Sequence, residues 1–485
     1  MATQTLYVGT DTAPFQTTIN GAPAKIELLW GDGVRVEGTI PQTGPVTGMA
    51  RGRKGQIDVA HLGGQSLLEF YFIDVGQGDG VLIRTPDGRH ILIDGGYTRK
   101  MQPTGKNAAD FVDWKFKKDY GRNEIVLDAM IASHNDADHY GGLWDLLNLA
   151  EMAELDVAQV NVKAFYHAGV GWWKKPGVTR SLGPKAGGFL TLLHEGRASM
   201  ESALASTNWT PQGEWRQFIQ SLVSMNPPIT NIQRVSHVTG HLPGFEPAPG
   251  KAAIRVLGPV EFDIGGGVPG LHSLGADSQN TNGNSVLLRV DYGTVRVLLT
   301  GDLNAKAQQS LLAHYTGDRL EFAADVAKAC HHGSDDCSLE FLAAIGAGAT
   351  VISSGDNETH AHPRPAIVAA SAVTGHRQIK DDKLVTPLIY STEIARSVRI
   401  AKIDSVTAAA VEVLKRDSIA QVDYSEVSSG ALRPKKGKRS WKNMMAVVGI
   451  VYGLVNVRTD GRKILCATMN EGKASWDLRT FESRF

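Results

Sequence analysis

Hydrophobic and polar positions follow three different patterns along the chain. Residues 1–66 consist of short alternating runs between turns rich in Gly, Asp and Pro. This pattern predicts a small β-rich domain of SH3-like size or a β-rich extension of the main body. Residues 67–400 alternate apolar runs of strand length with helical stretches, as is typical of an α/β domain. Residues 401–485 form a C-terminal extension with a basic linker and a hairpin signal around 459–462.

The main body repeats one order of elements. In its first half, an apolar strand at 68–75 precedes a hairpin, a second apolar strand and a helix. In its second half, hairpin strands at 285–300 precede strands that alternate with helices up to residue 353. Two such halves facing each other would form an αβ/βα sandwich. The stretch 151–250 lacks this order, and we expect it to be an insertion that covers one edge of the body.

The balance of charge restricts any contact with nucleic acid to local patches. The 485 residues include 50 Lys plus Arg and 50 Asp plus Glu, so the formal net charge is zero and a generally basic surface is excluded. Two basic segments remain, Trp172–Lys175 and Arg433–Arg439. Each either contacts phosphate or is structural: the first would then be a half-buried aromatic edge and the second a solvated linker.

Cysteine content and hydropathy favour a cytoplasmic protein with no membrane partner. Three cysteines cannot close a disulfide framework. The longest apolar run, at 444–455, is shorter than the roughly twenty residues that a membrane-spanning helix needs. The first ten residues lack the basic and apolar regions of a signal peptide.

The strongest chemical signal is the hexapeptide at 134–139, which follows the apolar run at 125–132 and precedes a helix predicted from residue 143. Its metal-binding side chains stand at positions i, i+2, i+4 and i+5: His134, Asp136, Asp138 and His139. In a loop, this spacing can direct ligands to two adjacent points, which suits two metal ions about 3.5–4 Å apart. So dense a group at the end of a buried strand is costly without a partner.

Further polar residues stand where other predicted strands end. Asp302 follows the hairpin strand that ends at residue 300, and His331 and His332 follow the apolar run 326–330. One of these histidines could be a metal ligand and one a general acid, because imidazole titrates near neutral pH; the sequence does not assign the roles. Gln77 and Asp79 lie in a Gly-rich loop, where they either touch the substrate or the ligands, or only accompany a tight turn.

As a set, these motifs resemble those of metallo-β-lactamase-fold hydrolases, and within that superfamily the hydrolase domain of ComEC-type competence proteins. The likeness covers about residues 68–370, in the family's order. The segments that carry it are Phe72–Asp79, Leu92–Gly96, Ser133–Gly142, Asn282–Val286, Leu299–Leu303, His331–Ser334 and His362–Pro363. The resemblance implies a metallo-β-lactamase αβ/βα sandwich, with residues 1–66 and the C-terminal tail outside it.

The resemblance also implies a role for each matching residue. His134 and Asp136 would hold one divalent metal ion. Asp138 and His139 would hold a second, with Asp302 bridging the two. We expect the ions to be Zn²⁺ or Mn²⁺, and we expect Asp138 to take part in catalysis together with His331 and His332.

Two departures from the family pattern affect the first metal site. Asp136 replaces the usual second histidine, and Asn284 stands where a further histidine ligand is common. The site is then rich in oxygen, which shifts its preference from Zn²⁺ towards Mn²⁺. Asn284 is either a ligand or substrate contact, or a residue of a backbone turn. His362 matches the last ligand position, and Asp94 matches the structural aspartate that orients the ligands.

The sequence therefore predicts a metal-dependent hydrolase in which a metal-activated hydroxide attacks the substrate. The ComEC-type resemblance favours a phosphodiesterase or nuclease acting on DNA or RNA. Two alternatives remain open. The same site could hydrolyse a small ester, lactone or amide, or the chain could be a binding module with a weak metal site. The sequence does not give the oligomeric state.

Overall fold

The computed structural model describes most of the chain. The described residues are 3–102, 104–354, 362–392, 453–470 and 475–485, together with short strands at 399–402, 405–407, 413–415, 421–426, 435–440 and 445–448. No helix within these ranges is long and apolar enough to cross a membrane.

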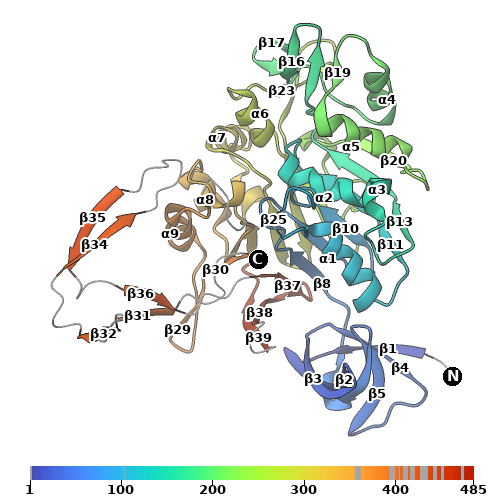
Figure 1. The fold of residues 1–485 in the computed structure, drawn as a ribbon, viewed down its shortest axis with the longest axis vertical. Coiled ribbons are helices and arrows are strands. Elements are labelled where there is room, and N and C mark those ends of the chain that lie inside the picture. The colour runs from blue at the N-terminus through green and yellow to red at the C-terminus, as the bar shows by residue number, and fades with distance from the viewer. Residues whose placement is uncertain are drawn as a thin grey trace.

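The N-terminal residues form a β-rich domain with a hydrophobic core of its own (Figure 1). Its single sheet has the strand order β3-β2-β6-β5-β4-β1-β7. The strands are β1 (Thr3–Val8), β2 (Thr12–Ile19), β3 (Ala22–Leu29), β4 (Gly33–Glu37), β5 (Pro45–Ala50), β6 (Arg53–Asp58) and β7 (Leu62–Gly64). Alternate residues of β4, Val34 and Val36, are buried, which is the period-2 pattern of a sheet with one covered face.

The first sheet of the main body has nine strands in the order β20-β14-β12-β10-β9-β8-β37-β38-β39. Their bounds are β8 (Leu68–Phe72), β9 (Val81–Arg84), β10 (His90–Ile93), β12 (Ala129–Ala132), β14 (Ala164–His167), β20 (Asn231–Arg234), β37 (Val455–Thr459), β38 (Lys463–Asn470) and β39 (Ser475–Glu482). β37 pairs antiparallel with β8, and all five of its residues are buried. The C-terminal hairpin is therefore part of the main sheet and not only the end of an extension.

The second sheet has six strands in the order β21-β24-β25-β26-β27-β30. They are β21 (Ala253–Gly258), β24 (Leu287–Tyr292), β25 (Val295–Leu299), β26 (Val326–Lys328), β27 (Ala349–Ile352) and β30 (Leu388–Ser391). One buried cluster joins the two sheets: it contains Phe70 and Ile83 of the first and Leu288 and Val297 of the second. The two sheets therefore pack face to face.

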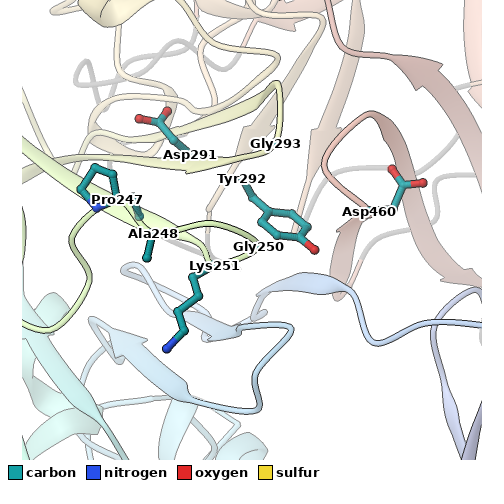
Figure 2. Close-up of a pocket in the computed structure, with 9 residues that line it drawn as sticks. Pro247, Ala248, Gly250, Lys251, Asp291, Tyr292, Gly293 and Asp460 are labelled. Atoms are coloured by element: carbon teal, nitrogen blue, oxygen red, sulfur yellow. The ribbon is translucent and has the colours of Figure 1, made fainter.

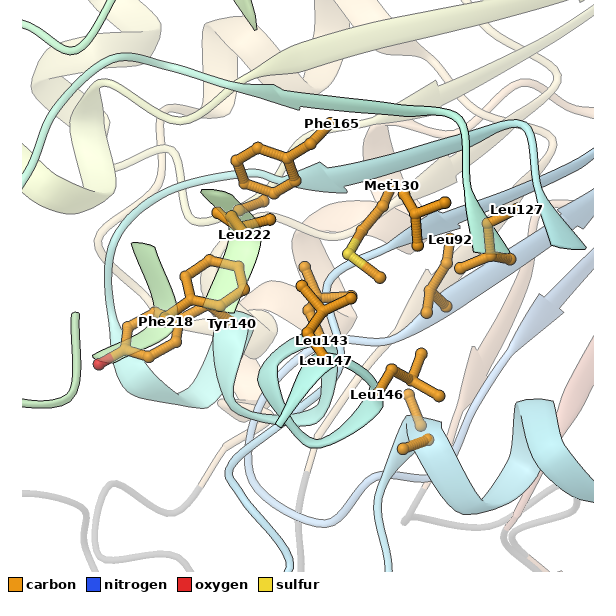
Figure 3. Close-up of a cluster of buried hydrophobic side chains, with 14 of the residues drawn as sticks. Leu92, Leu127, Met130, Tyr140, Leu143, Leu146, Leu147, Phe165, Phe218 and Leu222 are labelled. Atoms are coloured by element: carbon orange, nitrogen blue, oxygen red, sulfur yellow. The ribbon is translucent and has the colours of Figure 1, made fainter. Parts of the chain in front are cut away.

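Helices cover the outer face of each sheet. On the first sheet lie α1 (Ala108–Trp114), α2 (Ala137–Leu147) and α5 (Gly213–Ser224); on the second lie α7 (Ala305–His314) and α8 (Leu339–Ile345). Figure 3 shows Leu143 of α2 and Phe218 of α5 among the side chains that pack over Leu92 and Met130 of the first sheet. These layers confirm the predicted αβ/βα sandwich.

The predicted insertion at 151–250 does more than cover an edge, because β14 and β20 extend the first sheet beyond β12. The remaining elements of this part are α3 (Leu149–Met152), β13 (Gln159–Val162), β15 (Trp173–Lys175), β16 (Val178–Ser181), β17 (Lys185–Ala186), β18 (Phe189–Leu190), α4 (Arg197–Ala205) and β19 (Thr210–Pro211). Elsewhere lie β11 (Glu124–Leu127), β22 (Glu261–Asp263), β23 (Pro269–His272), α6 (Asp277–Gly283), α9 (Pro365–Thr374), β28 (Gln378–Lys380) and β29 (Lys383–Thr386).

The region of the predicted basic linker contains paired strands. β34 (Gln421–Glu426) pairs antiparallel with β35 (Lys435–Ser440), so most of the basic run lies in a strand, while residues 433–434 lie outside the described residues. Two further pairs are β31 (Arg399–Lys402) with β36 (Met445–Val448), and β32 (Ser405–Thr407) with β33 (Val413–Lys415).

Candidate metal centre

Strand ends from both sheets meet at one edge of the sandwich. Asp79 follows β8, Asp94 follows β10 and His134 follows β12. From the second sheet, Asp302 follows β25 and His332 follows β26. All five side chains are buried. The layered fold thus brings together residues that are up to about 250 positions apart in the sequence.

The helix that carries two of the motif residues begins earlier than predicted. α2 begins at Ala137 and not at residue 143, so Asp138 and His139 lie in its first turn. Asp136 is the residue before the helix and has extended backbone dihedral angles, as an N-cap residue does. Carboxylates at this end interact favourably with the helix dipole, which explains the early start.

Potential ligand atoms of the described residues form four overlapping groups, and two of them contain Asp302. Atoms of Asp302 lie within 4.8 Å of His134 and His139 in one group, and of Asp79 and His332 in the other. A third group joins Asp138, His139 and His332, and the fourth joins Asp79, Asp94 and His139. Asp302 Oδ2 lies 3.3 Å from His139 Nε2 and 3.0 Å from His332 Nε2. One carboxylate therefore faces the imidazoles of both groups.

Hydrogen bonds fix the tautomers of His139 and His332. Nδ1 of His139 lies 2.9 Å from Asp94 Oδ2. Nδ1 of His332 lies 3.2 Å from the carbonyl oxygen of Ser353 and 3.2 Å from Asp79 Oδ1. Because these partners only accept hydrogen bonds, each Nδ1 carries the proton and each Nε2 offers a lone pair to the cluster.

Ser285, which the sequence analysis did not single out, is one of two serines whose hydroxyls lie against His134 Nδ1; the other is Ser133, at 3.1 Å. The Ser285 hydroxyl donates to the carbonyl of Asn282 (2.7 Å) and accepts from the backbone N–H of Asp302 (3.1 Å). The hydroxyl has one proton, so towards His134 Nδ1, at 3.3 Å, it can only accept. His134 Nε2 is buried and has no hydrogen-bond partner among the described residues, as expected of an atom that binds a metal ion.

A buried lysine, also missed by the sequence analysis, holds one side of the cluster. The Lys328 ammonium pairs with Asp79 and donates to the carbonyls of Gly301 (3.1 Å) and Ala329 (3.0 Å). Lys328 lies in an otherwise apolar run, and a lysine there is rare unless it is paired. That rarity is the sequence signal that could have identified it.

Charge in the cluster favours a bound cation. Five carboxylates converge here, and Lys328 forms ion pairs with two of them, Asp79 and Asp302. The carboxylates belong to Asp79, Asp94, Asp136, Asp138 and Asp302. Burial raises the pKa of Asp302, but His332 and His139 outweigh it and hold that pKa well below its usual range. The donor set of imidazole nitrogens and ionised carboxylates therefore fits divalent Zn²⁺ or Mn²⁺.

Asp136 and Gln77 lie next to the ligand groups but belong to none of them. Asp136 Oδ2 accepts a hydrogen bond from Thr281 Oγ1 (2.9 Å) and lies 3.7 Å from His134 Nε2. Burial and the neighbouring Asp138 raise the pKa of Asp136 to about 6. Gln77 Nε2 donates to Asp138 Oδ2 over 3.0 Å, so it orients that carboxylate.

The two adjacent histidines take different positions. Both have positive φ angles, 45° for His331 and 50° for His332, a region that costs energy for residues other than glycine. This backbone turns His332 into the cluster and leaves the His331 side chain 26% exposed, with Nε2 at 3.8 Å from Asp302 Oδ2. The structure thus separates a buried ligand position from a position at the mouth of the site.

His362 and Asn284 lie outside the tight ligand groups formed by the described residues. The His362 ring centroid lies 5.6 Å from that of His331 and 6.3 Å from that of His332. The Asn284 side-chain amide donates to the carbonyls of Asn280 (2.9 Å) and His272 (3.1 Å). These bonds agree with the alternative that Asn284 is a turn residue.

The aromatic and basic segment of the insertion touches the metal loop. Trp172 is buried, and its Nε1 donates to the carbonyl of Asn135 over 2.9 Å. The Arg180 guanidinium carbon lies 3.7 Å from the Trp172 ring centroid, while Lys174 and Lys175 are exposed. Trp172 is therefore an anchor of the loop, and the cations around it remain on the surface.

Comparison with known proteins identifies the family. The model of the metallo-beta-lactamase superfamily matches residues 73–361, which is more than half of the chain. The protein belongs to this superfamily.

One curated relative and two solved structures add detail. The chain is 34% identical over 102 residues to competence protein ComA of Neisseria gonorrhoeae, a match that covers 21% of this chain and 14% of ComA. It resembles Tm1679, described as a metal-dependent hydrolase of the beta-lactamase superfamily, with 12% identity, a TM-score of 0.33, and coverage of 67% of this chain and 95% of that one. For Zn²⁺-bound PqqB of Methylobacterium extorquens, the identity is 10%, the TM-score 0.29 and the coverage 63% and 96%.

Proposed function

We propose that the protein hydrolyses phosphodiester bonds with two divalent metal ions, Zn²⁺ or Mn²⁺. One observation carries the proposal: Asp302 belongs to two ligand groups, and its Oδ2 lies 3.3 Å from His139 Nε2 in one and 3.0 Å from His332 Nε2 in the other. A carboxylate shared between two groups suits a pair of ions, and paired ions are common in phosphatases and nucleases.

The side chains divide the chemistry between them. His134 and His139 would hold one ion, and Asp138 and His332 the other, with Asp302 between them. When bound, such ions supply a hydroxide nucleophile near neutral pH and neutralise charge on the phosphoryl oxygens.

Two groups beyond the ligands complete the proposed mechanism. Asp94 keeps the His139 lone pair on Nε2. His331, at the mouth of the site, gives a proton from its imidazole to the leaving oxygen.

The basic rim of the insertion supports a polyanionic substrate, DNA or RNA. Lys174, Lys175 and Arg180 lie on β15 and β16, and Trp172 at the start of this hairpin is bonded to the metal loop. Arg180 forms no ion pair among the described residues, so its charge is available to a phosphate. The likeness to ComA agrees with the ComEC-type resemblance. The three free cysteines suit the reducing cytoplasm, where we propose that the protein acts.

The test is a substrate panel with the purified protein in Mn²⁺, Zn²⁺ or Mg²⁺. We expect hydrolysis of bis-p-nitrophenyl phosphate and of DNA or RNA, and loss of both activities after chelation. Hydrolysis of lactones, thioesters or β-lactams without any diester cleavage would instead establish the small-substrate alternative. No hydrolysis and no bound metal would favour the binding module.

Salt dependence tests the basic rim separately. Replacing Lys174, Lys175 and Arg180 with Ala should make the plot of log affinity for a polynucleotide against log salt shallower by about 2–3 units, at about 0.7–0.9 per phosphate contact. Turnover of the small diester should not change. The matched control replaces Lys25, Arg53 and Lys54 of the N-terminal domain with Ala and should leave the slope as it is.

A further inference from the structure

A second polar cavity lies at the junction of the N-terminal β-domain and the hydrolase body. Its volume is about 350 Å³. One wall comes from the β-domain, at 31–35 and 49–52, and the other from strands β8 to β10 and the segment 115–122. The two walls touch, since a Cβ added at Gly52 would lie only 1.7 Å from the Lys118 carbonyl oxygen. The cavity is thus part of a packed interface.

The cavity lies at the opposite end of the strands from the metal centre. Glu69, Arg84 and His90 line it and are paired in register across β8, β9 and β10. Asp79 and Asp94 lie at the other ends of these strands. The cavity and the metal centre therefore share no strand end.

The lining has more positive than negative charge. Five basic and three acidic residues face the cavity: Arg35, Arg51, Arg84, Lys115 and Arg122 against Asp32, Glu69 and Asp119. Each acid already has a basic partner: Asp32 pairs with Arg51, Glu69 with Arg84, and Asp119 with Lys115. Arg35 and Arg122 form no ion pair within the described part of the chain, which leaves two guanidinium groups for an anion.

Two buried polar atoms in the lining lack hydrogen-bond partners among the described residues. They are Nε2 of His90, a side chain that is 2% exposed, and the hydroxyl oxygen of Tyr120. The His90 and Tyr120 rings are neighbours, with centroids 5.4 Å apart. An unsatisfied buried polar atom costs about 1–3 kcal/mol, so such atoms indicate a place where a polar ligand binds.

A larger hollow on the second sheet does not have this character. Figure 2 shows its lining, which includes Lys251, Tyr292, Asp291 and Asp460, and its volume is about 500 Å³. The ammonium of Lys251 lies 3.9 Å from Asp87. Its acids outnumber its bases, so it does not suit an anion.

We propose that the junction cavity binds a phosphate ester of mononucleotide size. Guanidinium groups bind phosphate through paired hydrogen bonds, and Arg35 and Arg122 reach the cavity from its two walls. The Arg122 guanidinium carbon lies 5.8 Å from the Tyr120 ring centroid, so the ring positions Arg122 beside the cavity. The volume is within the range of small-molecule sites. A ligand held by both arginines would fasten the β-domain to the hydrolase body.

Calorimetric titration of the full-length protein with AMP, GMP, CMP, UMP and inorganic phosphate tests the proposal. We expect saturable 1:1 binding of at least one nucleotide, about tenfold tighter than that of phosphate. R35Q and R122Q should each weaken this binding about tenfold, the loss of about 1.4 kcal/mol. R53Q, a change at an exposed arginine of the same domain outside the cavity, should bind as the parent does.

The D302N variant distinguishes the cavity from the metal centre, which rests on other residues. Binding that survives D302N but is weakened by R35Q and R122Q supports the proposal. Binding that D302N abolishes and R35Q leaves unchanged places the nucleotide at the metal centre and overturns it. The proposal is also overturned if none of the nucleotides binds, or if phosphate binds as tightly as they do.

Discussion

Strands β8, β9 and β10 carry buried polar groups at both ends, and the two ends differ in how those groups are matched. At the metal centre, the Nε2 atoms of His134, His139 and His332 have no hydrogen-bond partners among the described residues, and lone pairs converge. At the other end, the buried guanidinium of Arg458 is matched to carboxylates, while the unmatched Nε2 of His90 lines the junction cavity. Buried polar groups therefore indicate a binding site where they are left unmatched, as in the metal centre and the junction cavity, and a structural role where they are matched, as at Arg458.

Arg458 joins three distant parts of the chain. Its Nη1 donates to Asp32 Oδ1 and to the carbonyl of Trp30, both over 2.7 Å. Nη2 lies 3.6 Å from Glu69 of β8. Arg458 itself belongs to β37, so the N-terminal domain, the first strand of the body and the C-terminal hairpin meet at one side chain.

The largest effect should come from a substitution in the metal centre. Asp302→Ala removes a carboxylate shared by two ligand groups, so diester hydrolysis should fall by more than the roughly 100-fold that loss of a supporting residue causes. Metal content, measured by mass spectrometry, should fall with it. Asp318→Ala, at an exposed site, is the control. Full activity with unchanged metal content in Asp302→Ala would contradict the assignment.

A substitution of Arg458 should lower the stability of the protein without changing its metal binding. Arg458→Ala leaves Asp32 and Glu69 buried with fewer partners, so the free energy of unfolding should fall by about 3–5 kcal/mol. Urea titration measures this loss, and the metal content of the folded protein should stay normal.

Arg462→Ala is the matched control for Arg458→Ala. Arg462 lies in the turn beside β37, its side chain is 86% exposed, and it lies 3.5 Å from Glu482. Its replacement should cost about 0–1 kcal/mol. Equal effects of the two changes would remove the distinction between buried and exposed charge.

A smaller effect is expected from Asp94→Asn. The amide cannot accept the Nδ1 proton of His139 through its nitrogen, so the imidazole loses its fixed tautomer, and metal affinity should fall about 10–100-fold. Competition with a chelator measures the affinity. Asp113→Asn is the control, since Asp113 is also buried and accepts backbone N–H bonds, from Asp156 and Val157, away from the site. Unchanged affinity in Asp94→Asn would show that the hydrogen bond does not orient the ligand.

Acid should gradually weaken the ion pairs that Asp32 forms with Arg458 and Arg51. Burial raises the pKa of Asp32, but Arg458 and Arg51 outweigh it and lower that pKa below 3.8. A lowered pKa in the folded state stabilises the protein fully above the unfolded value, and this stability is lost as the pH falls through the folded one. Below pH 3.8 we expect a loss of up to about 1.4 kcal/mol per pH unit. Asp32→Asn should flatten the curve of thermal stability against pH; parallel curves would contradict the coupling.

The sequence predicted what local pattern encodes. The strand before His134, the hairpin strands and the alternation with helices follow from hydrophobic period, and the motif residues follow from their spacing at strand ends. Contacts between distant segments have no such signal. The pairing of β37 with β8 and the orientation of His134 by Ser285 depend on tertiary packing alone. Lys328 had a local signal, a charge inside an apolar run, but its partner Asp79 could not be read from it.

The pairing of β37 with β8 has a consequence for synthesis. Phe70 and Asn456, bonded across these strands, are 386 residues apart, and ribosomes add about 5–20 residues per second. The nascent chain therefore presents one edge of β8 unpaired for about 20–80 s. An exposed strand edge is a template for wrong pairing. The edge of β8 that β37 covers therefore stays open to wrong pairing until β37 has been synthesised.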